Sequence, residues 1–139
     1  MKKITIAIFS TCRADFGILL PFLNRLNKNR NFNVKFFIGG SHFLKSHGFT
    51  YKEIIKNNID INNTFPFKFN IDNEENFIKN IIFSNQKLIS IFKNNKFDYI
   101  CLLGDRVELI SIALFSLIHR IELIHIGGGE ETFGAIDNK

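Results

Sequence analysis

Residues whose types could do chemistry gather in four short segments, each directly after an apolar run. The segments are STCRAD at 10–15, GGSH at 39–42, GDR at 104–106 and GGGEE at 127–131. Arginine binds a phosphate through two hydrogen bonds, and glycine lets backbone amides approach a ligand closely. A carboxylate at a strand end beside an arginine can also serve as a base. This mixture is what a site for a phosphate or a sugar requires.

Several of these residues also have a plain structural explanation. Arg13 is either a phosphate ligand or a surface residue at a helix entrance. Asp105 is either a base or a helix N-cap, two roles that do not exclude each other. Arg106 and Glu108 fall at a helix start, where both can be solvated. His42 either contacts a ligand or packs inside the protein.

The remaining candidate residues also have both a functional and a structural interpretation. The glycine run at 127–129 can be a tight turn, although the acidic pair beyond it favours backbone that approaches a ligand. His125 lies in the last predicted strand, where a buried, hydrogen-bonded imidazole is at least as reasonable as a catalytic one. Cys12 and Cys101 are interpreted as a loop residue and a core residue, not as a redox pair.

Two common kinds of site are not indicated. No Gly-x-Gly-x-x-Gly pattern follows the first apolar run, and no phosphate-binding loop of the Gly-Lys-Ser/Thr type occurs. The four histidines and two cysteines lack the spacing of zinc ligands. We therefore expect no metal, no cofactor and a phosphorylated small-molecule ligand.

The composition limits the number of domains, the kind of ligand and the cellular location that we expect. A chain of 139 residues with 45% hydrophobic and 22% charged residues predicts one globular domain. Residues 1–56 hold ten Lys or Arg and two carboxylates, which fits an anionic ligand, but no basic run supports a nucleic-acid partner. The apolar runs at 4–9 and 109–118 are too short for a signal peptide or a membrane span. Two cysteines favour a reducing, cytoplasmic location.

The elements that must position these segments alternate between strand and helix. Buried strands are predicted at 3–9, 33–38, 98–103 and 121–126, with a weaker one at 65–69 that contains Pro66. Helices are predicted at 15–29, 51–57, from a cap at Asp72 or Asn73 to about 92, and at 106–119. Pro21 predicts that the first helix starts just before it or bends there. This order predicts a doubly wound α/β domain with a parallel sheet.

The predicted fold also predicts where the site lies. Ligands of open parallel sheets bind beyond the carboxyl ends of the strands, where the strand order reverses. All four polar segments should therefore project from one edge of the sheet. The strands at 3–9 and 98–103 are the expected pair at the reversal.

Taken together, the segments resemble the UDP-N-acetylglucosamine 2-epimerase family, above all its hydrolysing branch in sialic and legionaminic acid synthesis. The resemblance spans essentially the whole chain. It is carried by TCRADFG at 11–17, GSH at 40–42 with GFTYKE at 48–53, LGDRVE at 103–108, HIGGGE at 125–130 and GAID at 134–137.

The resemblance implies that residues 1–139 are a Rossmann-like first lobe of a GT-B arrangement, whose second lobe is missing from this chain. It implies an elimination that expels the nucleoside diphosphate from a nucleotide sugar, followed by hydration to the free 2-epimer. Asp105 and Asp137 match acid/base residues, and Glu130 matches a common glutamate of the family. Some members carry a glutamate where this chain has Gly127.

The resemblance also assigns residues to substrate binding. Arg13 matches an arginine near the diphosphate, and His42 lies where the family lines the sugar site. Arg106, Gly128 and Gly129 complete the expected substrate-binding set. Full-length members are expected to form homo-oligomers.

Two other interpretations remain open. The chain can be a non-catalytic module for nucleotide-sugar binding or assembly, or it can belong to another GT-B enzyme, such as a non-hydrolysing epimerase or a glycosyltransferase. If the chain is part of such a two-lobed enzyme, one lobe alone cannot close the cleft. We therefore expect the isolated chain to turn over slowly or not at all.

Overall fold

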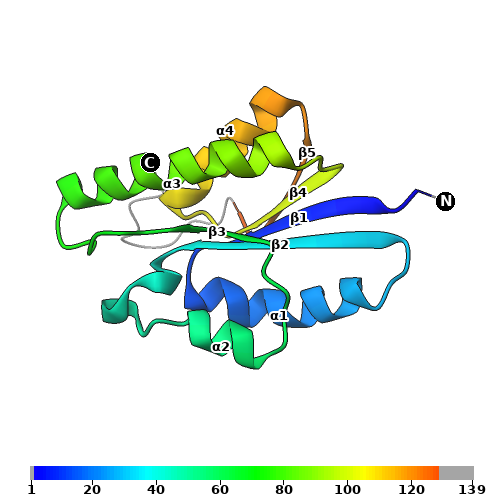
Figure 1. Cartoon of the computed structure of the whole chain (residues 1–139), viewed down its shortest axis with the longest axis horizontal. Helices are drawn as coiled ribbons and strands as arrows, with labels where there is room; N and C mark the ends of the chain where they lie inside the picture. The colour runs from blue at the N-terminus through cyan, green and yellow to red at the C-terminus, as the bar shows by residue number, and fades with distance from the viewer. Residues whose placement is uncertain (1, 129–139) are drawn as a thin grey trace.

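The computed structural model describes residues 2–128, and in this part of the chain five parallel strands form one sheet with helices on both faces (Figure 1). The strands are β1 (Ile4–Ser10), β2 (Phe32–Gly40), β3 (Asn63–Pro66), β4 (Tyr99–Leu103) and β5 (Glu122–Ile126). The helices are α1 (Arg13–Asn27), α2 (Tyr51–Lys56), α3 (Glu74–Asn94) and α4 (Val107–His119), with two short 3₁₀ turns, η1 (Ser41–Phe43) and η2 (Lys45–His47).

The strand order is β3-β2-β1-β4-β5, which confirms the doubly wound, Rossmann-like fold. The chain steps outward from β1 to β2 and β3, then returns to place β4 on the other side of β1. Ile8 of β1 is paired with Phe36 of β2 and with Cys101 of β4. The strand order therefore reverses between β1 and β4, as the sequence predicted.

Both faces of the sheet are buried, which explains the continuous apolar runs of its central strands. Ile6 and Ile8 point toward α1 and α2, whereas Ala7 and Phe9 point toward α3 and α4. Figure 1 shows the two helix pairs on opposite sides of the sheet. The chain consequently leaves β1 toward one face and β4 toward the other.

Two boundaries differ from the predictions because of proline. Helix α1 begins at Arg13 and runs through Pro21, so the expected start just before Pro21 is wrong. Proline crowds the carbonyl four residues earlier, and here that residue is Gly17, which is exposed and has open space around it. Strand β3 ends at Pro66, earlier than predicted, and lies at the sheet edge, where proline is tolerated.

The start of α3 agrees with the capping prediction. The side chain of Asn73 accepts a hydrogen bond from the Asn76 backbone N–H at 2.8 Å. Asp72 accepts hydrogen bonds from the side-chain amides of Asn73 and Asn76 at 3.2 and 2.8 Å. These contacts stabilise the first turn of α3.

Apolar residues at helical spacing usually mark the buried face of a helix, but in α4 one such face is exposed. Val107, Ile110, Leu114 and Leu117 share one face of the helix, but that face is exposed, and Leu117 is 75% exposed. Leu109 and Ile112 pack on the sheet instead. A helix that is apolar almost all round gives no periodic signal of which face is buried. Ile78 and Ile82 of α3 are exposed as well.

This orientation predicts a sharp contrast within α4. Leu109→Ala should lower the free energy of unfolding by about 3 kcal/mol, because the side chain is 5% exposed and its loss leaves a cavity. The matched control Leu117→Ala should change it by less than about 0.5 kcal/mol. Urea unfolding of both variants measures the difference. Equal effects would mean that α4 is rotated relative to this description.

Candidate functional site

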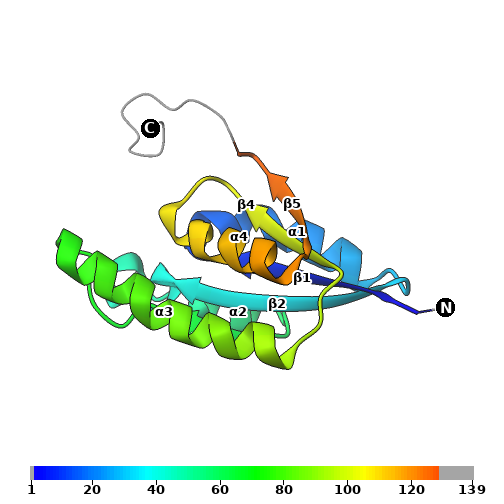
Figure 2. The same cartoon turned by 90° about the horizontal axis from the view of Figure 1, so that it is seen from above.

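The polar segments that follow β1, β2 and β4 lie together at the carboxyl edge of the sheet, and the start of the segment after β5 joins them. The last strand lies outermost on the β4 side (Figure 2). Gly104 donates a backbone hydrogen bond to Ile126 at 2.8 Å, and Ser41 donates one to Thr11 at 2.9 Å. Neighbouring loops are thus tied to each other. The expected common edge is confirmed for these loops.

Asp15 organises the loop after β1. Its carboxylate accepts hydrogen bonds from the Thr11 backbone at 3.0 Å, the Thr11 hydroxyl at 2.9 Å, the Cys12 backbone at 3.0 Å and the Cys12 thiol at 3.1 Å. The residue is 7% exposed. Burial is the main cause that raises the pKa of the Cys12 thiol, so the thiol stays protonated and donates. Sequence reasoning missed this role of Asp15, although an acidic residue three positions after the N-cap, here Cys12, is a capping signal.

Arg13 points away from this loop into solvent. Its side chain is 73% exposed and its Nε lies 3.1 Å from a carboxylate oxygen of Glu53 on α2. An exposed ion pair of this kind is weak, so the guanidinium remains free to exchange Glu53 for an anionic ligand. The two residues border a cavity of about 480 Å³ together with Thr50, Lys52 and Lys56.

His42 is fully buried between two loops. One ring nitrogen, Nε2, lies 2.9 Å from the Ser10 hydroxyl, and the other, Nδ1, lies 2.6 Å from the Thr50 hydroxyl. Burial lowers the pKa of His42 from 6.5 to about 4, so the ring is neutral near pH 7. The geometry favours the packing alternative, in which His42 braces the loops after β1 and β2. Contact with a sugar stays a prediction.

Gly40 makes the close approach of these loops possible. Its φ is +53°, and a Cβ there would lie 2.6 Å from the carbonyl oxygen of Thr11. We expect Gly40→Ala to lower the free energy of unfolding by at least about 2 kcal/mol, from both the backbone conformation and the clash.

The control is Gly17→Ala, in the exposed part of α1 with no atom within 4 Å of the new Cβ. It should be neutral or stabilising by about 0.5–1 kcal/mol. Thermal unfolding distinguishes the two glycines. A tolerated Gly40→Ala would contradict the described loop contact.

Arg106 and Glu108 form an ion pair at the start of α4, with 2.7 Å between Nη2 and Oε1. The Glu108 side chain is 4% exposed, so the expectation of two solvated residues is wrong for Glu108. Burial opposes the charge on Arg106, but the hydrogen bond and the charge of Glu108 outweigh it and raise the pKa of Arg106. Arg106 therefore keeps a fixed positive charge at the end of β4.

Asp105 is exposed between β4 and α4. The N-cap position of α4 belongs to Arg106, and no side chain caps the helix, so the N-cap interpretation of Asp105 is wrong. Within residues 2–128, no hydrogen bond involves its carboxylate. The carboxylate is thus available to a ligand at the point where the strand order reverses.

The loop after β5 begins with a close contact between Gly128 and His125. The imidazole of His125 is hydrogen-bonded to the carbonyl of Gly104, and a Cβ on Gly128 would overlap that ring. His125 is exposed at this edge strand, so the alternative of a buried histidine is wrong, although its ring is hydrogen-bonded. Gly129, Glu130 and Asp137 lie outside the described residues.

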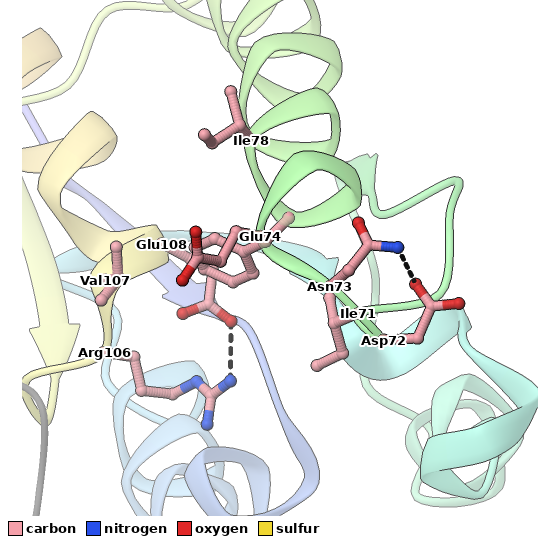
Figure 3. A pocket seen from close by; sticks show the side chains of 9 residues that line it. Ile71, Asp72, Asn73, Glu74, Ile78, Arg106, Val107 and Glu108 are labelled. Atoms are coloured by element: carbon pink, nitrogen blue, oxygen red, sulfur yellow. Dashed lines mark hydrogen bonds and ion pairs between the residues drawn. The ribbon is translucent and has the colours of Figure 1, made fainter.

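A cavity of about 690 Å³ lies between the first turns of α3 and α4 (Figure 3). Sequence reasoning missed the part of the site that comes from α3. Only the capping signal at Asp72 and Asn73 indicated a helix start at this edge. The lining residues are Ile71, Asp72, Asn73, Glu74, Phe77, Ile78, Arg106, Val107 and Glu108.

No group of three or more His, Cys, Asp or Glu side chains among residues 2–128 is arranged to hold a metal ion. In the same part of the chain, no helix is long and apolar enough to cross a membrane.

Comparisons with known structures show the same fold. A crystal structure of a UDP-N-acetylglucosamine 2-epimerase superposes with a TM-score of 0.76 at 17% identity, over 94% of this chain and 35% of that one. The UDP-GlcNAc 2-epimerase from Neisseria meningitidis, solved bound to UDP-GlcNAc, gives a TM-score of 0.71 at 19% identity, over 96% and 34%.

Sequence comparisons identify relatives. The chain is 31% identical over 138 residues to the GDP/UDP-N,N'-diacetylbacillosamine 2-epimerase (hydrolyzing) of Campylobacter jejuni, covering 99% of this chain and 36% of that protein. It is 30% identical over 137 residues to polysialic acid biosynthesis protein P7 of Escherichia coli, covering 99% and 34%. The chain thus spans about a third of the length of these relatives. A family model described as UDP-N-acetylglucosamine 2-epimerase matches residues 24–139. The chain therefore belongs to the UDP-N-acetylglucosamine 2-epimerase family.

Proposed function

We propose that this chain is the N-terminal part of a hydrolysing nucleotide-sugar 2-epimerase. Its substrate would be UDP-N-acetylglucosamine or a related nucleotide sugar with an acetamido group at C2. One observation carries the proposal: the exposed carboxylate of Asp105 lies at the reversal of strand order, next to the charged Arg106 that Glu108 holds in place. The relative in Campylobacter jejuni, whose name includes the hydrolysing reaction, supports the choice of branch.

The proposed reaction has two steps and consumes only water. In the first, a base removes the proton at C2, the C1–O bond to the diphosphate breaks, and a glycal with a C1–C2 double bond forms. In the second, water adds its hydroxyl to C1 and a proton reaches C2 from the opposite face. The products are the free 2-epimer and the nucleoside diphosphate.

Each described site residue has a place in this scheme. Asp105 accepts or returns the C2 proton, because its carboxylate is exposed and unbonded within the described residues. Arg13 and Arg106 stabilise the negative charge that develops on the leaving diphosphate. Gly128 lets backbone approach the sugar, and His42 holds the loops that carry these groups. Glu130, Asp137 and Gly129 are proposed to complete the site.

The test follows hydrogen at C2. The native protein is incubated in D₂O with UDP-N-acetylglucosamine or its 4-acetamido-6-deoxy analogue. We expect UDP and a free 2-epimer that carries deuterium at C2. A 2-epimer that keeps its UDP would instead indicate a non-hydrolysing epimerase. Binding without deuterium exchange would indicate a non-catalytic module, and either result would overturn the proposal.

We also propose that the native protein contains a second lobe. Because the chain spans about a third of its relatives, we expect the isolated 139 residues to turn over slowly or not at all. The intact mass of the native protein should then lie well above 16.1 kDa. Robust activity of the isolated chain would contradict the need for a second lobe.

A further inference from the structure

The outward surface of α3 and α4 is unusually apolar. More than half of the exposed large hydrophobic side chains among residues 2–128 lie on these two helices, which cover the same face of the sheet (Figure 1). From Val107 to Ile118, the exposed side of α4 carries no charged side chain, because Glu108 is buried in its ion pair with Arg106. Single apolar residues are ordinary on a protein surface, but a contiguous apolar patch indicates a contact with another molecule.

The apolar residues on the outside of α3 have a regular spacing. Ile78, Ile82, Asn85 and Ile89 follow one another at intervals of four, three and four residues, so they form one stripe along the helix. The three isoleucines are 56–58% exposed. Core residues of α3 such as Leu88 lie on a different side of the helix, against the sheet. Helix α3 therefore has one apolar side for the sheet and a second one for another contact.

Helix α4 repeats this spacing on its own outward side. Val107, Ser111, Leu114 and Ile118 again stand four, three and four residues apart, and the three aliphatic members are 40–65% exposed. An alternation of three and four residues is the repeat of helices that pack together along a shared seam. Both helices therefore present a seam that no other element of residues 2–128 covers.

The two stripes border one groove between α3 and α4. At one end of this groove, Ile78 and Val107 line the cavity of about 690 Å³ that Figure 3 shows. Farther along the helices, the ring of Phe92 on α3 packs against the ring of Phe115 on α4, with 5.1 Å between their centroids. Each ring lies one turn along its helix from a member of the stripe. Leu117, two residues after Phe115, lies on the opposite flank of α4 and outside the groove.

The charges at the two ends of this helix layer favour a second copy of the protein as the partner. Helix α3 starts with Glu74 and Glu75, whereas Lys93 lies in its last turn and Arg120 ends α4. Both helices start at the carboxyl edge of the sheet, so the layer has an acidic end and a basic end. A two-fold axis that sets the helices of two copies antiparallel places the acidic end of one copy over the basic end of the other.

The size and direction of the groove agree with this partner. Its six aliphatic residues expose on the order of 600 Å², most of the roughly 800 Å² that each partner contributes to a stable interface. A second lobe of the same molecule fits less well, because the chain leaves β5 at the carboxyl edge and the proposed cleft lies beyond that edge. The groove instead faces outward from the helix layer.

We propose that the groove between α3 and α4 is the interface through which two copies of the native protein form an antiparallel, two-fold dimer. The stripes of one copy pack against the same stripes of the other, which removes the exposed isoleucine, leucine and valine side chains from water. The proposed reaction does not depend on this interface, so either proposal can fail without the other.

The experiment measures the mass of the native-length protein by light scattering after gel filtration, over a series of protein concentrations. We expect the parent to have at least twice the mass of one protomer. Ile82→Lys combined with Leu114→Lys should halve that mass, because the interface would bury two unpaired ammonium groups from each copy. The dissociation constant should rise at least about 100-fold.

The matched control is Ile18→Lys, because Ile18 is 63% exposed on α1, across the sheet from the groove. This variant should keep the parental mass, and thermal unfolding shows whether each variant is folded. If the lysine pair does not fold, Ile82→Ala combined with Leu114→Ala decides, since it should raise the dissociation constant at least about 10-fold. A monomeric parent, groove variants that dissociate no more readily than the parent, or an equal loss of mass in Ile18→Lys would overturn the inference.

Discussion

Between about pH 7 and pH 4, the free energy of unfolding is expected to fall by about 3 kcal/mol because of His42 alone. The ring is fully buried between the Ser10 and Thr50 hydroxyls, and both of its nitrogens are engaged. Burial is the main cause that lowers its pKa from 6.5 to about 4, and the charge of Arg106 acts in the same direction. The charge of Asp15 opposes both.

The sign of this effect follows from proton binding. Above the unfolded pKa of 6.5, His42 is neutral in both states and does not change the stability. As the pH falls below 6.5, His42 binds a proton in the unfolded chain but stays neutral in the folded chain until about pH 4. The unfolded state therefore binds more protons in this window, and the stability falls as the pH falls.

Urea unfolding at several pH values measures the effect. His42→Gln should be less stable than the parent near neutral pH, but its stability should fall less steeply below pH 6.5, because glutamine takes up no proton. The control is His47→Gln on the neighbouring turn, which should change the stability by less than about 0.5 kcal/mol because His47 is exposed. An unaltered slope in His42→Gln would contradict the assignment.

The fold could be predicted from the sequence because its strongest signals are local. The apolar run at 4–9 has residues buried on both faces, so it contains no alternation and indicates a central parallel strand. Asn73 indicates the start of α3 because its capping hydrogen bond involves only a residue nearby in the sequence, Asn76. Helix α4 shows the limit, since its orientation depends on which side meets the sheet.

The site could be predicted only in part, for a related physical reason. The polar segments after the strands are visible as motifs, and the parallel topology brings them to one edge. The burial of His42 and the four hydrogen bonds to Asp15 depend on how two loops meet, which no spacing specifies. The cavity between the first turns of α3 and α4 depends on how these two helix starts are placed, so its lining could not be assembled from the motifs.

Asp15→Ala is expected to lower the free energy of unfolding by about 3 kcal/mol, the largest loss at the edge of the sheet. Four donors from Thr11 and Cys12 converge on this one carboxylate, and all of them would lose their partner. Asp15→Asn should fall between alanine and the parent, because the amide keeps one acceptor oxygen but places an NH₂ group against the same donors. Asp60→Ala, at an exposed position, is the control and should change the stability by less than about 0.5 kcal/mol.

A double-mutant cycle separates these hydrogen bonds from the general effect of a negative charge at a helix N-terminus. Thr11→Val removes only the hydroxyl that lies 2.9 Å from Asp15. If that bond is part of the network, Thr11→Val should destabilise the parent but have a much smaller effect once Asp15 is alanine, with a coupling energy of at least about 0.5 kcal/mol. The helix dipole alone would make the two changes additive, because the threonine hydroxyl carries no charge. Coupling would show that Asp15 shapes the loop that presents Arg13, so Asp15→Ala should then also weaken UDP binding. Additive effects would instead restrict Asp15 to an electrostatic role at the start of α1.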